Sequence, residues 1–227
     1  RGFQHHKEIY RLYDSEENSF DIHYDFAAEL QSKYAEIVSS CPMDCLNSMD
    51  LIAKDESNNN SAGIHDIVST NNNFAAVFSV NVLQSLSGKL FEGAEAMSVS
   101  RSLANKLFHT ENVLGNTLEF GNTILKFKGK ITSVFEDLPE NSSFKADLLM
   151  NSENKDFSFS TACENGICWK RSNMFVQLRP GASAAELVSK LNSLKNLDRY
   201  YIGRLETQRF DDIYLSDLPV KDKHIKG

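Results

Sequence analysis

The strongest constraint on the fold is a strand–helix–strand pattern that occurs twice, once near each end of the 227-residue chain. In the first copy, residues 9–13 predict a strand. Residues 25–37 carry apolar side chains at helical steps of four, four and three, with Asp25 as the expected N-cap. Residues 37–41 predict a second strand that stops at Pro42, since proline interrupts a strand.

The second copy uses the same order of elements. A strand at 174–178 closes at Pro180-Gly181, and Ser183 begins a helix with a capping box at Glu186. Further strand material is expected at 202–207 and 213–215. Such units usually place their helices on one face of a shared sheet, so we expect an outer subdomain built from both ends of the chain.

The middle of the chain is rich in strand and turn signals. The Gly121-Asn122 turn predicts a hairpin over 117–127, and another strand is expected at 130–135. The Asn-rich stretches 54–62 and 70–73 predict loops. The fold class expected is therefore α+β. A discontinuous outer subdomain (residues 1–62 and 169–227) carries an inserted β-rich subdomain (residues 63–168).

Charge and hydropathy exclude several kinds of partner. The 24 basic and 31 acidic side chains give a net charge of −7, which provides no attraction to nucleic acid or an anionic bilayer. The longest apolar run, 74–78, is far shorter than the roughly 20 residues that cross a bilayer. Because the chain starts at Arg1 and ends without a capped element, we expect a soluble piece of a longer protein.

The four cysteines form two close pairs, Cys41 with Cys45 and Cys163 with Cys168. Their spacing fits neither a zinc knuckle nor a CxxC redox site. Two local disulfides, two cross-links between the pairs, and thiols all stay open, because sequence alone does not choose a connectivity. Any disulfide would imply an oxidising compartment.

Motifs for chemistry are not found. The six histidines form no HxH or HExxH pattern, and no phosphate-binding glycine loop or nucleophile elbow occurs. We therefore expect no catalytic, cofactor-binding or metal-binding residues, and a binding or scaffolding module rather than an enzyme. Trp169 admits two interpretations, a partner-binding anchor or a packed residue at the subdomain junction, and we favour the second.

Several segments, in order along most of the chain, resemble one family. Residues 96–108 with 113–118, around Gly115, are similar to its "val-ser-ser-leu-ala-lys-lys-phe … ile-gly-lys-thr-leu" pattern. Residues 130–144 resemble "val-thr-gly-val-leu-lys-asp-leu-pro-glu-asn-ser-his-phe", in which the most specific part is Leu138, Pro139, Glu140 and Asn141. Trp169 and the Pro180-Gly181 turn match its "trp … tyr-val-leu-leu-lys-pro-gly" strand. The chain thus resembles the MacB-like periplasmic core domain of FtsX-like ABC transporter permeases, in the Bacteroides-type form.

In the family that the chain resembles, the outer subdomain is called porter and the inserted one Sabre, so we expect a porter-like outer and a Sabre-like inserted subdomain. It implies a bacterial periplasmic domain of an inner-membrane protein. Its expected partners are a cytoplasmic ABC ATPase reached through membrane helices, a second permease copy, and a periplasmic adaptor with an outer-membrane channel. The excised domain is expected to be a monomer. The cysteine pairs and the Asn-rich stretch 54–62 depart from the family pattern.

The implied function is mechanical coupling of cytoplasmic ATP hydrolysis to export or extraction of a periplasmic peptide, drug or lipoprotein. A domain that transmits force needs rigid bodies joined by a hinge, so we expect hinges at the connectors 58–73 and 151–168. A signal passed to a cell-wall hydrolase is a further use within the family. The alternative is a free periplasmic ligand-binding or sensor module, for which a deep pocket lined by aromatic side chains is expected.

Overall fold

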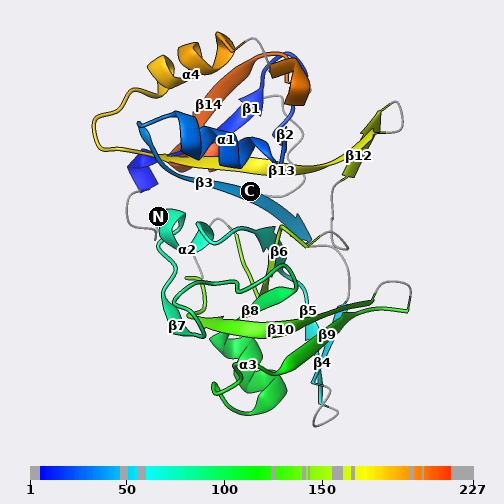
Figure 1. The fold of residues 1–227 in the computed structure, drawn as a ribbon. Coiled ribbons are helices and arrows are strands. Elements are labelled where there is room, and N and C mark those ends of the chain that lie inside the picture. The colour runs from blue at the N-terminus through cyan, green and yellow to red at the C-terminus, as the bar shows by residue number, and fades with distance from the viewer. Residues whose placement is uncertain are drawn as a thin grey trace. The chain divides into compact units, whose positions relative to one another are not determined.

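The protein divides into two compact units. The computed structural model describes residues 6–46, 51–55, 60–123, 126–139, 142, 144–154, 161–164, 167–194, 197–200 and 202–215. Unit 1 comprises Arg1–Asp44, Ala76–Ser79 and Ser160–Gly227, and unit 2 comprises Cys45–Ala75 and Val80–Phe159. Figure 1 shows the elements of both units.

Unit 1 contains two α-helices, three 3-10 helices and six strands among the described residues. In chain order these are η1 (His6–Glu8), β1 (Ile9–Asp14), β2 (Asp21–His23), α1 (Phe26–Lys33), β3 (Ile37–Leu46), β12 (Thr161–Glu164), β13 (Ile167–Leu178), α4 (Ala184–Asn192), η2 (Leu197–Tyr200), β14 (Leu205–Arg209) and η3 (Phe210–Leu215).

The main ladder of unit 1 has the strand order β14-β1-β13-β3. The two strand–helix–strand units therefore interleave, because each pair of sequence neighbours brackets a strand of the other pair. This βαββαβ order is the ferredoxin-like, split arrangement. Its core is formed between the strands and one side of both helices, with Leu12 and Met174 packed among Phe26, Leu30 and Leu187. The α+β fold class is confirmed.

Helix and strand boundaries differ from the sequence prediction at three places in unit 1. Helix α1 ends at Lys33 because Tyr34 is extended, and Ile37 instead begins β3 opposite Leu178. Strand β3 continues through Pro42, which pairs with Met174, since proline removes only its own donor from the ladder. Residues 213–215 lie in η3, not in a strand.

Of the two helix N-caps predicted from the sequence, the one at Ser183 is confirmed and the one at Asp25 is wrong. Asp25 makes no side-chain cap hydrogen bond and has a helical backbone. Ser183 caps α4 as predicted, since its Oγ accepts a hydrogen bond from the Glu186 amide at 3.3 Å. Ser100 caps α3 in the same way by accepting from Leu103 N at 3.1 Å.

Unit 2 is built on a mixed sheet covered by helix α3. Its strand order is β6-β11-β8-β10-β9-β4-β5, with β7 also paired to β10. The elements are β4 (Leu51–Asp55), β5 (Ser61–Ile64), β6 (Ile67–Thr70), α2 (Phe74–Val77, which extends into unit 1), β7 (Val82–Ser85), β8 (Ala96–Ser100), α3 (Arg101–Phe108), β9 (Thr117–Gly121), β10 (Lys126–Phe135) and β11 (Leu148–Asn151).

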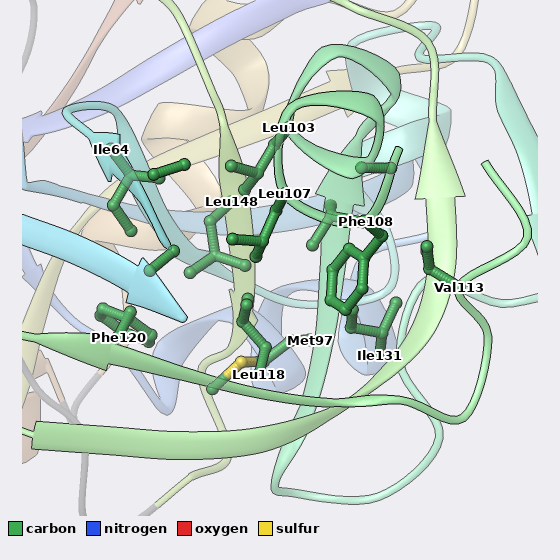
Figure 2. Close-up of a cluster of buried hydrophobic side chains, with 14 of the residues drawn as sticks. Ile64, Met97, Leu103, Leu107, Phe108, Val113, Leu118, Phe120, Ile131 and Leu148 are labelled. Carbon is green, nitrogen blue, oxygen red and sulfur yellow. The ribbon is translucent and has the colours of Figure 1, made fainter. Parts of the chain in front are cut away.

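The core of unit 2 fills the space between α3 and the sheet. Leu103, Leu107 and Phe108 of α3 contact side chains from the strands, among them Met97, Leu118 and Ile131. Figure 2 shows these side chains pointing toward one another. The predicted hairpin is confirmed as β9–β10, and the strand expected at 130–135 is the second half of β10.

The two units differ in extent from the two subdomains expected from the sequence. The loop predicted at 54–62 contains the end of β4 and the start of β5. Strand β4 was expected in the outer subdomain, but it pairs with β5 and β9 and belongs to unit 2. Strand β12 pairs with β13 and belongs to unit 1. The boundaries at 62/63 and 168/169 and the two hinges stay predictions.

Gly129 marks a close approach between neighbouring strands, which leads to a first prediction. A Cβ at this position would overlap the carbonyl oxygen of Glu95 and would lie 2.7 Å from Met97 Cε. We expect Gly129→Ala to lower the free energy of unfolding by about 1–3 kcal/mol through overpacking, measured by urea denaturation. Gly63→Ala is the matched control, since its nearest neighbour is His65 Nε2 at 4.0 Å; an equal loss in both variants would contradict the prediction.

A second prediction concerns the ion pair that ties α4 to the residues before β3. Lys190 Nζ lies 2.6 Å from Glu36 Oε1, and this hydrogen bond holds the pKa of the Glu36 carboxyl below its usual value. The stabilisation is therefore present at neutral pH and is lost as the pH falls through the lowered pKa. We expect Lys190→Met to lower the melting temperature slightly at neutral pH and low salt, and to have no effect at strongly acid pH. A loss that persists at strongly acid pH would contradict this assignment.

Candidate functional site

The candidate site is the place in unit 1 where the first and last described segments of the chain meet. Strands β1 and β14 pair antiparallel, with Tyr10 opposite Arg209, so β1 begins where β14 ends. The short helices η1 and η3 that flank this ladder contact each other. The first and the last described segments of unit 1 thus lie side by side.

A pair of side chains joins the two flanking helices. His6 Nδ1 lies 2.7 Å from Asp211 Oδ1. The other oxygen, Asp211 Oδ2, accepts a hydrogen bond from Arg209 Nη2 at 3.2 Å. All three side chains are partly exposed, so the contact positions the segments rather than stabilising them strongly.

Aromatic side chains anchor η3 to unit 1. Phe210 is buried, and its ring centroid lies 5.7 Å from that of Phe78 and 6.0 Å from that of Phe175. Phe78 and Phe175 themselves are 5.3 Å apart. Phe78 comes from the short stretch 76–79, which the sequence interpretation places in the inserted subdomain and the structure places in unit 1.

A buried arginine lies in the middle of the same ladder. Arg11 is only 2% exposed, and its guanidinium donates to Gln208 Oε1 at 2.6 Å and to Asn173 Oδ1 at 3.2 Å. Its Cζ also lies 3.4 Å from the centre of the Phe20 ring, which is cation–π geometry. Asn173 Nδ2 is buried and has no partner among the described protein atoms. The cluster therefore holds Arg11 between three strands at a desolvation cost.

At its other end, the ladder is closed by a buried carboxylate. Asp14 is 3% exposed and accepts hydrogen bonds from the backbone amides of Glu16, Glu17, Gly203 and Arg204, the shortest at 2.7 Å. Asp14 thereby fixes the turn after β1 to the segment that leads into β14. Asp14 was assigned no role from the sequence, where it is an ordinary charged residue at the end of a strand.

The residues expected to carry the family pattern are distributed over both units. Gly115 turns the chain before β9 with φ of 88°, and its amide donates to Ile131 O at 2.8 Å. Pro180 and Gly181 form the turn after β13, where Gly181 has φ of 82° and Ala182 N donates to Arg179 O at 3.0 Å, as in a type II turn. These residues shape turns and form no common site.

The Leu-Pro-Glu-Asn segment follows β10 in unit 2. Leu138 is half-buried and Pro139 is exposed, and Glu140 and Asn141 lie outside the described residues. The preceding Asp137 has a clear role, because its carboxylate accepts from Ser102 N at 3.1 Å and Ser102 Oγ at 2.9 Å at the start of α3. Asp137, the residue next to the motif, is thus placed at the N-terminus of α3.

The cysteines and the tryptophan are the remaining expected residues. Cys41 and Cys45 are buried thiols in β3. The backbones of Cys163, Cys168 and Trp169 belong to β12 and β13, and their side chains lie outside the described residues.

One surface cavity lies in unit 2. It has a volume of about 460 Å³ and opens over the hairpin face that points away from the core. No aromatic side chain lines it; its lining consists of Ile52, Lys54, Glu119, Gly121, Asn122, Thr123 and Lys126. In the described part of the chain, no three His, Cys, Asp or Glu residues gather as metal ligands would, and no helix is long and apolar enough to cross a membrane.

The buried arginine gives a third prediction. We expect Arg11→Met to lower the free energy of unfolding by about 2–4 kcal/mol, since it leaves Gln208 and Asn173 with unmet hydrogen-bonding groups. Arg11→Lys is expected to recover only part of this, because an ammonium lacks the planar fork. Chemical denaturation measures both; Arg204→Met, at an exposed position, is the control and should change stability by less than about 0.5 kcal/mol. If the Arg11→Lys variant were as stable as the unmodified protein, the role assigned to the planar guanidinium would be contradicted.

Comparison with known proteins identifies what this fold is similar to. The model of the MacB-like periplasmic core domain family matches residues 8–194. A domain of a Porphyromonas gingivalis protein assigned to the permeases superposes with a TM-score of 0.65 at 20% identity, covering 91% of this chain and 92% of that one. The comparison with curated proteins gives no match.

Two further solved structures have the same fold. The periplasmic region of MacB from Actinobacillus actinomycetemcomitans superposes with a TM-score of 0.63 at 13% identity, over 95% of this chain and 94% of that one. The extracellular domain of the noncanonical ABC-type transporter YknZ from Gram-positive bacteria gives 0.54 at 15% identity, over 88% and 99%.

Proposed function

Because the chain belongs to the MacB-like periplasmic core domain family, an extracytoplasmic part of ABC transporter permeases, we propose that it couples cytoplasmic ATP hydrolysis mechanically to export or extraction of a periplasmic substrate. A peptide, a drug or a lipoprotein is the substrate class that the family implies. The ATPase would act on the cytoplasmic side and reach this domain through membrane helices that flank it. A second permease copy, a periplasmic adaptor and an outer-membrane channel complete the proposed assembly.

The observation that carries this proposal is the pairing of the first and last described segments in unit 1. If membrane helices lie on both sides, their movements reach unit 1 at a single place, through η1 and η3. The His6–Asp211 contact and the buried Phe210 tie both segments to the same sheet. A shared attachment point lets unit 1 move as one body, which is what a domain that transmits force requires.

The alternative is a free ligand-binding or sensor module. Such a module is expected to bury most of its ligand in a pocket with aromatic walls. The cavity over the β9–β10 hairpin is lined by Ile52, two lysines, a glutamate and small residues, with no aromatic side chain among them, which favours the mechanical role. A screen for ligand-dependent shifts in melting temperature separates the two, since only a binding module would respond to a small molecule.

A first experiment is to read the coding sequence on both sides of this chain. One membrane helix upstream and three downstream are expected for the permease. A leader peptide upstream with no further membrane helix would contradict the proposal and support the free module.

A fourth prediction tests mechanical coupling directly. In the complete permease with its ATPase, we expect a spin label at exposed position 110 to show a copy-to-copy distance that changes when the ATPase is trapped with ATP and vanadate. Phe210→Ala should reduce this change without reducing ATP hydrolysis, because it loosens η3 from the aromatic cluster. Asp212→Ala, an exposed change in the same helix, is the control. An unchanged distance in the unmodified protein would reject the coupling.

A further inference from the structure

The hairpin formed by β12 and β13 places two cysteines directly opposite each other. Its antiparallel register pairs Glu164 with Ile167 and Cys163 with Cys168. Two residues, 165 and 166, separate the strands, and in the sequence these are Asn-Gly, the pair that most favours a two-residue hairpin. Backbone pairing and turn sequence therefore agree on the register that opposes the cysteines.

This register is the one suited to a cross-strand disulfide. In an antiparallel ladder, hydrogen-bonded and non-hydrogen-bonded pairs alternate, and the pair that closes a two-residue turn is hydrogen-bonded. Cys163 and Cys168 are the next pair and so form a non-hydrogen-bonded position, where Cα atoms are about 4.5 Å apart. Disulfides need Cα separations of about 4.4–6.8 Å.

The other cysteine pair does not meet this requirement. Cys41 and Cys45 lie four residues apart on the single strand β3, a separation of about 13 Å at ordinary strand rise. Both are buried thiols, and Cys41 Sγ lies 3.7 Å from the carbonyl oxygen of Pro42. Cys41 is also opposite Phe175, seven residues along β13 from Cys168, which separates these two by about 23 Å along the strand.

The β12–β13 hairpin, which we call the arm, would be stabilised by a cross-link between its strands. Among the described strands, β12 pairs only with β13, so the arm is a two-stranded ribbon that extends beyond the main ladder of unit 1 (Figure 1). An isolated two-stranded hairpin is marginally stable in water. A covalent link next to the turn would hold the arm in register.

We propose that Cys163 and Cys168 form a structural disulfide that closes the β12–β13 hairpin, while Cys41 and Cys45 stay reduced. In the extracytoplasmic compartment, the oxidant is a thiol oxidoreductase in its disulfide form. One cysteine thiolate attacks that disulfide to give a mixed disulfide, and the second then displaces the carrier. The two thiols lose two electrons and two protons, and the carrier leaves as a dithiol.

The test uses the reduced chain and glutathione disulfide as the oxidant. After native incubation, the protein is denatured, alkylated and analysed by mass spectrometry, which counts thiols and maps the linked peptides. We expect the thiol count to fall from four to two, with Cys163 linked to Cys168 and both Cys41 and Cys45 alkylated only after denaturation. Amide exchange in the paired segments 161–164 and 167–170 should slow on oxidation.

Two double variants make the outcome specific. Cys163→Ser with Cys168→Ser should keep two thiols with or without oxidant, and its arm should exchange at the rate of the reduced protein. Cys41→Ser with Cys45→Ser should go from two thiols to none. Four remaining thiols in the unmodified chain, or a linkage that includes Cys41 or Cys45, would overturn the proposal, and this readout does not depend on whether either variant folds.

Discussion

The pairing of β1 with β14 is the constraint on which unit 1 depends, because it joins two strands from opposite ends of the chain. Three polar contacts lie along this one ladder: His6 with Asp211, Arg11 with Gln208, and Asp14 with the amides of residues 203 and 204. Arg11 also reaches Asn173 of β13, so one guanidinium ties the three neighbouring strands β14, β1 and β13 together. Without this ladder β14 and the adjoining η3 would lose their place in the sheet, since among the described strands β14 pairs only with β1.

The parts of the fold that repeat a local pattern could be predicted from the sequence. Ser183 is followed by apolar residues at helical spacing, and the helix forms there with the expected cap. The same reasoning extended α1 to Ile37, because Tyr34 and Ile37 continue the helical spacing of apolar residues. Tyr34 is only partly buried, and Ile37 is buried as the first residue of β3. The sequence Ile-Tyr-Leu at 213–215 favours a strand by residue type. In the structure these residues instead end the 3-10 helix η3, which begins at Phe210, a member of the aromatic cluster.

The candidate site could not be predicted in the same way. Arg11 and Asp14 become buried only when strands from residues 173 and 205 onward pair beside β1, and nothing within a few residues of either position signals that partner. The Leu-Pro-Glu-Asn segment is the most specific part of the family pattern, but the contact with α3 is made by Asp137, which precedes it. The burial and the hydrogen bonds of Arg11 and Asp14 depend on strand pairing between distant parts of the chain, whereas the local sequence indicates only which secondary structure each segment favours.

The interleaved strand order also fixes the sequence of events during synthesis. Unit 2 is complete once residue 159 has left the ribosome, since its ladders join strands between residues 51 and 151. Strand β1 is made first, but its ladder partners β13 and β14 begin at residues 167 and 205, and the Arg11–Gln208 contact spans 197 positions. Contacts of such separation form slowly, because a long loop must close first. Strand β1, the first of the described strands, therefore stays without its two ladder partners until β13 and β14 have been made, and during that time its unpaired edge is a site at which the nascent chain can associate wrongly.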